Sequence, residues 1–117
     1  MCNSPGSLPT IEFIAGETRT FTYNVYSGSI SNPCTLSKAV FSITPSTNKF
    51  GDPVISKTMT VSQNKISVTL SSNDTINLSG KYLYQIVVKD TAGAIEIPDH
   101  GVLYIKNNID KAGTSDL

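Results

Sequence analysis

In "LSSNDTINLSGKYLYQIVVKD", residues 70–90, a polar tract and a glycine precede an apolar run, and this pattern is the clearest fold signal in the chain. Apolar side chains recur at every second position of that run: Tyr82, Tyr84, Ile86 and Val88. A period of two is typical of a β-strand with one face in a core. Leu83 and Val87 place apolar side chains on the opposite face as well, which predicts a central strand that is partly covered on both sides.

The polar tract before the glycine has the composition of a helix cap. Ser72 or Asn73 can cap one helical turn, and Asp74 would then lie near its positive end. Gly80 permits a tight reversal before the strand begins. We therefore interpret the tract as a corner that turns the chain beneath the core, and not as a catalytic loop.

Short apolar segments of the same kind recur about every ten residues, with turn residues between them. They cover residues 10–16, 16–28, 35–45, 54–61, 65–70, 81–90 and 95–97, and the last resumes at 102–107 after a break at Pro98–Gly101. This spacing predicts an all-β, immunoglobulin-like antiparallel β-sandwich of about seven strands with at most one short helical turn. A small barrel is the alternative. Antibody domains carry a Cys–Trp–Cys signature, which this tryptophan-free chain lacks.

The length of 117 residues suits a single domain. Residues 10–106 are expected to form the sandwich. Residues 1–9 contain two prolines and a glycine and are expected to form an extended leader. The polar tail, residues 107–117, is expected to be frayed.

Composition and charge argue against several classes of partner. Nine basic and nine acidic residues balance, and the lysines are scattered, so no nucleic-acid partner is expected. No apolar run approaches the length of a membrane span, so no membrane association is expected. A net charge near zero does little to keep molecules apart, which is compatible with self-association.

The two cysteines, Cys2 and Cys34, do not form a motif. We expect two free thiols, as in a protein made in a reducing cytoplasm, and a Cys2–Cys34 disulfide is the alternative. Two cysteines and one histidine fall short of a closed tetrahedral zinc site. The acidic residues do not follow the spacing of a calcium loop either, so we expect no metal and no cofactor.

Catalytic chemistry has little support. His100 is the sole histidine and lies in "PDHG", where we interpret it as a polar turn residue. No serine stands in a nucleophile-elbow motif near it. The candidate acids for a carboxylate pair are isolated from one another along the chain: Glu12, Glu17, Asp52 and Glu96. We therefore expect a non-enzymatic protein with no catalytic residues; a small hydrolase would require His100 in a pocket beside a nucleophile.

Tyrosines could bind sugars if two or three gathered on an exposed face. Tyr23, Tyr82 and Tyr84 instead lie on predicted core faces, with hydroxyls that can reach the rim. Tyr26 stands at a strand end and is the best candidate for a surface recognition residue.

Several segments, taken in order, resemble a family of small phage virion proteins related to the immunoglobulin-like N-terminal domain of the siphophage baseplate upper protein. The matching segments are "GETRTFT" (16–22), "AVFSI" (39–43), "LSSNDTINLSGKYLYQIVVKD" (70–90), "TAG" (91–93) and "HGVLYI" (100–105). The resemblance covers residues 10–106. Each motif is weak alone, and the order and spacing carry the likeness.

The resemblance implies a non-enzymatic phage or prophage virion structural protein in a baseplate, tail or head-accessory position. Its expected partners are other virion proteins and further copies of itself, and its expected location is the virion after synthesis in the bacterial cytoplasm. This chain stops soon after the sandwich, which puts in doubt a role in carrying a receptor-binding tip. The alternative function is a carbohydrate-binding or adhesin-type surface recognition module that binds a host surface glycan.

Overall fold

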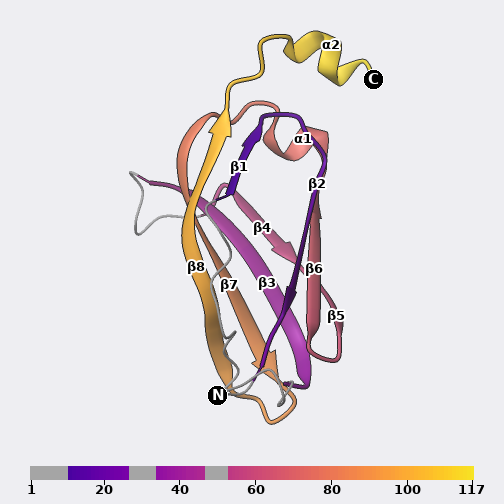
Figure 1. The fold of residues 1–117 in the computed structure, drawn as a ribbon, viewed down its shortest axis with the longest axis vertical. Helices are drawn as coiled ribbons and strands as arrows, with labels where there is room; N and C mark the ends of the chain where they lie inside the picture. Colours follow the sequence, from indigo (N-terminus) through magenta and orange to yellow (C-terminus); the bar gives the residue numbers. More distant parts are fainter. Residues whose placement is uncertain (1–10, 27–33, 47–52) are drawn as a thin grey trace.

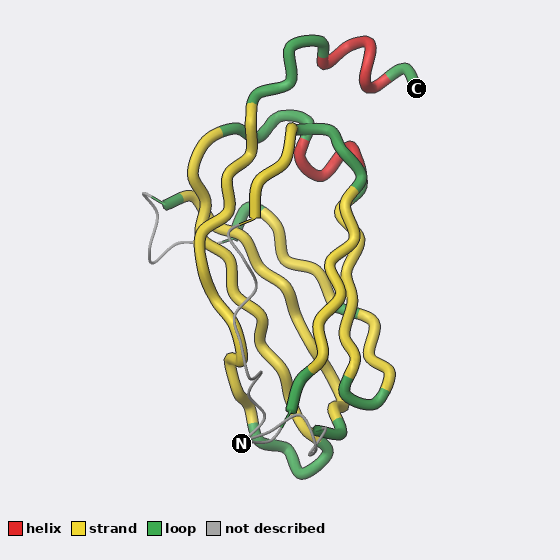
Figure 2. The backbone as a smooth tube through the Cα atoms, viewed as in Figure 1, coloured by secondary structure: helices red, strands yellow, loops and turns green. Residues whose placement is uncertain are grey.

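The computed structural model describes residues 11–26, 34–46 and 53–117, and the expected leader lies outside them. Eight strands form two facing sheets (Figure 1). The strands are β1 (Ile11–Ile14), β2 (Arg19–Asn24), β3 (Leu36–Pro45), β4 (Ile55–Thr58), β5 (Thr60–Ser62), β6 (Lys65–Leu70), β7 (Gly80–Asp90) and β8 (Ile95–Lys106). Two short helices, α1 (Ser72–Thr75) and α2 (Lys111–Ser115), lie at the same end of the sandwich (Figure 2). Neither helix is long and apolar enough to cross a membrane.

The order of the strands is that of an immunoglobulin-like sandwich. One sheet has the order β1-β8-β7-β3-β4 and the other β2-β6-β5. Strands β2, β6 and β5 take the places of strands B, E and D, and β8, β7, β3 and β4 those of G, F, C and C′. β1 runs parallel to β8, and all other described pairs are antiparallel. The predicted fold class is therefore confirmed, and two separate sheets rather than a closed barrel have formed.

An aromatic column joins the two sheets through the centre of the core. The Phe41 ring of β3 is fully buried and lies 5.8 Å from the Phe21 ring of β2 and 5.9 Å from the Tyr84 ring of β7, between centroids. Phe21 also lies 6.4 Å from Phe13 of β1. In antibody domains an inter-sheet disulfide and a tryptophan connect the same strands. Here aromatic contacts make that connection.

Tyr84 reaches its position because the residue opposite it is a glycine. Tyr84 pairs with Gly101 of β8. A Cβ atom at Gly101 would lie only 3.0 Å from the Tyr84 ring and 3.1 Å from its hydroxyl. The missing side chain thus leaves the space into which the ring packs.

The corner between β6 and β7 has the predicted character. The Ser71 N–H donates to Asp74 Oδ2 at 2.7 Å, so the cap is Ser71, one residue before the predicted Ser72. At the start of β7 the Tyr82 hydroxyl accepts from the Ser79 N–H and donates to the Ser79 carbonyl, both at 3.2 Å. These contacts confirm that the polar tract is a structural corner.

An ion pair ties this corner to the opposite sheet. Lys57 of β4 points inward, with its Nζ 2.5 Å from Asp74 Oδ2 and 3.3 Å from the Thr69 carbonyl that accepts from it. Partial burial by itself raises the pKa of the Asp74 carboxyl, but hydrogen bonds from Lys57 and Ser71 and the Lys57 charge outweigh it and leave that pKa below its ordinary value.

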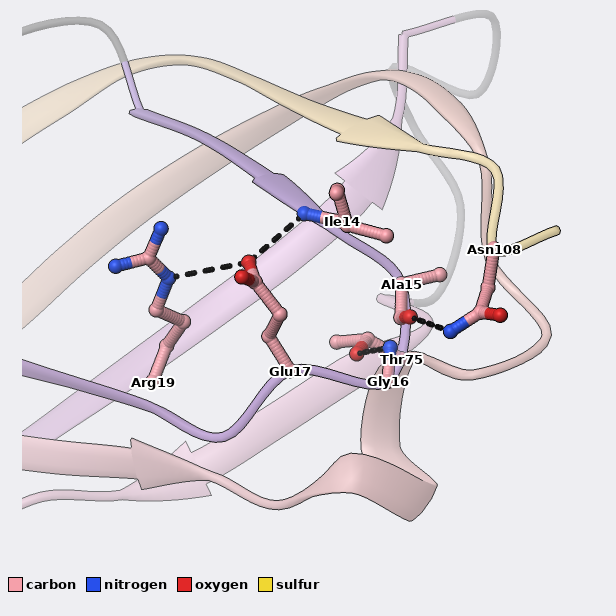
Figure 3. A network of polar contacts seen from close by, with 7 residues as sticks. All are labelled: Ile14, Ala15, Gly16, Glu17, Arg19, Thr75 and Asn108. Atoms are coloured by element: carbon pink, nitrogen blue, oxygen red, sulfur yellow. Dashed lines mark hydrogen bonds and ion pairs between the residues drawn. The ribbon is translucent and has the colours of Figure 1, made fainter. Parts of the chain in front are cut away.

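The polar tail is held by hydrogen bonds against the α1 end of the sandwich. The sequence had predicted a frayed tail, and the structure differs from that prediction. Asn108 Nδ2 donates to the Ala15 carbonyl at 2.7 Å (Figure 3). The same atom donates to Thr114 Oγ1 at 2.9 Å. The Gly16 N–H donates to the fully buried Thr75 Oγ1 at 2.9 Å. Hydrogen bonds from one side chain in the tail therefore fix a segment whose composition alone indicated disorder.

The last strand is continuous, so the predicted break at Pro98–Gly101 is wrong. The β7–β8 register shifts between Ile86 and Val88, which leaves Ile97 and Pro98 opposite the single residue Val87. Such a bulge tolerates a proline, which cannot donate to the ladder. The interpretation of His100 as a turn residue is wrong for the same reason, because His100 lies within β8.

Substitution of Phe41 by alanine tests the aromatic column. Phe41→Ala removes the ring that contacts both sheets, and it should lower the free energy of unfolding by about 3–5 kcal/mol in urea denaturation. Tyr104→Ala, which removes a partly exposed aromatic side chain, serves as the control and should cost less than about 1 kcal/mol. Equal losses in the two variants would contradict the central role of Phe41.

The Lys57–Asp74 pair predicts a dependence of stability on pH. Because the folded-state pKa of Asp74 is lowered, its contribution is present above the unfolded-state pKa and is lost as pH falls through the folded value, below about pH 4. Lys57→Met should cost about 1 kcal/mol near neutral pH and progressively less in acid. Lys65→Met, on an exposed strand position, is the control and should cost about the same at every pH.

Candidate functional site

The outer faces of the two sheets differ in chemistry. On the three-stranded sheet, the outward residues of β2 and β6 are polar, and Thr20 and Thr69 share a 2.9 Å hydrogen bond between their hydroxyls. Thr22 and Ser67 form the next outward pair. A face of this kind is suited to contact with water.

The outer face of the five-stranded sheet carries apolar residues at its centre. We define the front face as the outward side chains at the middle of β3, β7 and β8: Val40, Ser42, Thr44, Leu83, Gln85, Val87, His100 and Val102. They form rows across the strands, with Leu83 between Thr44 and Val102. The apolar members are half-buried. The sequence predicted outward apolar side chains at Leu83 and Val87, and the structure confirms their orientation.

The front face is hollowed into a depression of about 700 Å³. Leu83, Val102 and Pro53 give it apolar walls, and Ser42, Gln85 and His100 add hydrogen-bonding groups without a fixed charge. Such a surface can bind a neutral group that combines an apolar part with hydrogen-bonding atoms. Ser42, Gln85 and His100 form one row across β3, β7 and β8. The sequence did not predict this row, because only the strand register brings its three members together.

His100 and Ser42 lie on the same row but are not neighbours on it. Gln85 lies between them, so their backbones are two strand spacings, about 10 Å, apart. No hydrogen bond joins His100 to Ser42 within the described part of the chain. Among the same residues no cluster of three His, Cys, Asp or Glu side chains could hold a metal ion.

Lysines surround the front face. We define the rim lysines as Lys38, Lys81, Lys89 and Lys106. Lys38 and Lys89 lie directly opposite each other on β3 and β7, an arrangement of like charges that costs stability. Of the rim lysines, only Lys106 has an ion pair with a described residue: its Nζ lies 2.7 Å from Glu12 Oε1. The hydrogen bond and charge of Glu12 raise the pKa of Lys106. The periphery of the front face is therefore positive.

The tyrosines do not gather into an exposed platform in the described residues. Tyr23, Tyr82 and Tyr84 are buried, as predicted. Tyr104 is exposed and lies near the α1 end, opposite Lys81. Tyr26 is half-buried and follows the far end of β2. The recognition role suggested for Tyr26 stays a prediction.

Cys34 is disulfide-bonded, so the expectation of a free thiol at this position is wrong. Cys2 is the chain's other cysteine and lies outside the described residues. Cys34 is buried, and its N–H donates to the Val25 carbonyl at 3.1 Å. Sequence spacing did not reveal this location because the contact depends on how the chain returns to the end of β2.

Loss of the disulfide should destabilise the domain. Cys34→Ser should lower the free energy of unfolding by about 3 kcal/mol, because the cross-link restricts the unfolded chain. Reductant should lower the stability of the natural sequence by a similar amount and leave Cys34→Ser unchanged. Complete alkylation of Cys34 in denaturant without reductant would contradict the disulfide.

Comparison with known proteins finds little likeness in sequence. No family model and no curated protein matches the chain. Among solved structures, the chain is similar to the fibronectin(III)-like modules of Clostridium thermocellum CbhA, with 12% sequence identity and a TM-score of 0.46. The match covers 92% of this chain and 98% of that one.

Proposed function

We propose that this chain is a non-enzymatic assembly module that binds another protein through its front face. The observation that carries the proposal is the half-buried apolar centre, Leu83, Val87 and Val102, on a sheet face that no described element covers. The core does not require apolar residues there, since the inward positions of the same strands already fill it. An apolar patch of this kind on a sheet is typical of an interaction surface.

The distribution of charge on the front face also fits a protein interface. Charged residues are depleted at the centre of such interfaces and occur at their polar rim. The front face has no fixed charge at its centre, and the rim lysines lie around it. Its hydrogen-bonding groups, Ser42, Gln85 and His100, can satisfy the polar groups that a partner brings.

We further propose that the module works in a phage or prophage virion, in a baseplate, tail or head-accessory position, with other virion proteins as partners. The support is the resemblance of the ordered sequence motifs. The segments that carry it include most of β2, the middle of β3, the α1 corner with β7, and the second half of β8. These are the elements that build the core and the front face.

A carbohydrate-binding module is the second candidate, and the depression favours it. A sugar ring offers an apolar face that suits Leu83 and Val102, and hydroxyls that suit Gln85 and His100. Binding to a glycan array that is lost in Gln85→Ala would support this candidate. Loss of glycan binding in Tyr26→Ala alone would instead place the sugar site at the end of β2.

A charge at the centre of the front face should prevent assembly. Leu83→Glu should weaken co-purification with virion proteins co-expressed with this chain at least tenfold, because it buries a carboxylate in the interface. Thr69→Glu, on the outer face of the other sheet, is the matched control and should bind normally. Gln85→Arg, at an exposed position, repeats the test without risk to the core.

Thermal unfolding of each variant would establish that it is folded. The assembly proposal fails if folded Leu83→Glu and Gln85→Arg both bind their partners as strongly as Thr69→Glu does.

A further inference from the structure

We propose that the front face of one copy receives the C-terminal tail, residues 107–117, of a second copy; this inference rests on the proposed function and names the partner. The tail carries an apolar side chain that nothing in its own copy covers. Ile109 is fully exposed, at 101% of its reference area. It is adjacent to Asn108, whose side chain holds the tail in place.

The tail is ordered, so the exposure of Ile109 is built into the fold. Asn108 binds the Ala15 carbonyl and Thr114, and Asp110 Oδ1 accepts from the Gly113 N–H at 2.9 Å. Thr114 Oγ1 also donates to the Asp110 carbonyl at 2.9 Å. These bonds present Ile109 in a fixed position and lower the entropy that docking would cost.

The same bonds keep the tail away from its own front face. Asn108 directs the chain over the corner between β1 and β2, where Thr114 lies close to Gly16. Figure 1 shows α2 beyond the end of the sandwich, on the side of α1. The centre of the front face lies further down β7 and β8, so contact with the tail requires another copy.

The tail and the rim of the front face differ in charge. The tail carries Asp110 and Asp116 against one lysine, Lys111. The front face is bordered by the rim lysines, of which Lys38 and Lys89 lie directly opposite each other and Lys106 is paired with Glu12. In the proposed contact, Ile109 occupies the apolar part of the depression and Asp116 lies against a rim lysine.

Because the tail and the front face are different surfaces, the contact is heterologous. Each copy has one of each, so the association can propagate into a ring or an open chain rather than stop at a two-fold dimer. A repeating arrangement of this kind suits the assembly role proposed above.

Two complementary variants test the inference in the full chain. Ile109→Lys disables the tail, and Leu83→Glu disables the front face. By analytical ultracentrifugation the natural sequence should grow in mass with concentration, and each variant alone should remain a monomer. An equimolar mixture should form a one-to-one complex and nothing larger, because it contains one intact tail and one intact front face. Thr69→Glu, the control, should associate like the natural sequence.

A second pair of variants tests the charge contribution. Lys89 and Lys81 lie at opposite ends of the front face along β7. Replacement of the lysine that contacts Asp116 by glutamate, Lys89→Glu or Lys81→Glu, should weaken self-association at low salt at least fivefold. Asp116→Lys combined with the weakening substitution should restore association. Gln85→Arg, mixed with Ile109→Lys, repeats the complementation if Leu83→Glu fails to fold.

The inference is overturned if the mixture stays monomeric, if Ile109→Lys associates normally, or if the natural sequence is monomeric at every concentration. None of these results removes the proposed function, because that function is tested by binding to other proteins. It predicts that Leu83→Glu loses this binding and that Ile109→Lys keeps it. Self-association lost in Leu83→Glu and kept in Ile109→Lys would indicate face-to-face pairing instead.

Discussion

The contact of Phe41 with Phe21 and Tyr84 is the interaction on which the rest of the structure depends. It spans the gap between the sheets at the place where antibody domains use a disulfide and a tryptophan. Dispersion and burial of three aromatic rings replace a covalent cross-link there. The arrangement constrains β8 as well, because the Tyr84 ring occupies the space that a side chain at Gly101 would need.

Polar contacts complete one end of the sandwich where apolar packing stops. Thr75 satisfies a backbone N–H at Gly16, and Asn108 satisfies the carbonyl of Ala15. Buried backbone groups without such partners would be costly, so the network allows the β1–β2 corner, α1 and the tail to pack together. The position of the tail, and hence the exposure of Ile109, follows from the same network.

The front face has a different origin. Inward positions of β3, β7 and β8 are apolar because the core requires it, whereas outward positions are free of that requirement. Threonines fill the outward positions of β2, but Leu83 and Val87 occupy them on β7. This difference between the two faces of one small domain is the basis of the proposed interface, at whose edge the rim lysines lie.

Local periodicity was sufficient to predict the core strand of residues 81–90, the capped corner and the sandwich class, because alternation and capping act over neighbouring residues. Local pattern was therefore enough to identify the core-facing side of β7 and the corner at α1, but not the continuity of β8. Three outcomes came from the tertiary structure alone. His100 of β8 lies opposite Gln85 of β7. Cys34 is disulfide-bonded, and Asn108 holds the tail by a hydrogen bond to Ala15. Those outcomes depend on strand register and on contacts between distant segments, which no local pattern encodes.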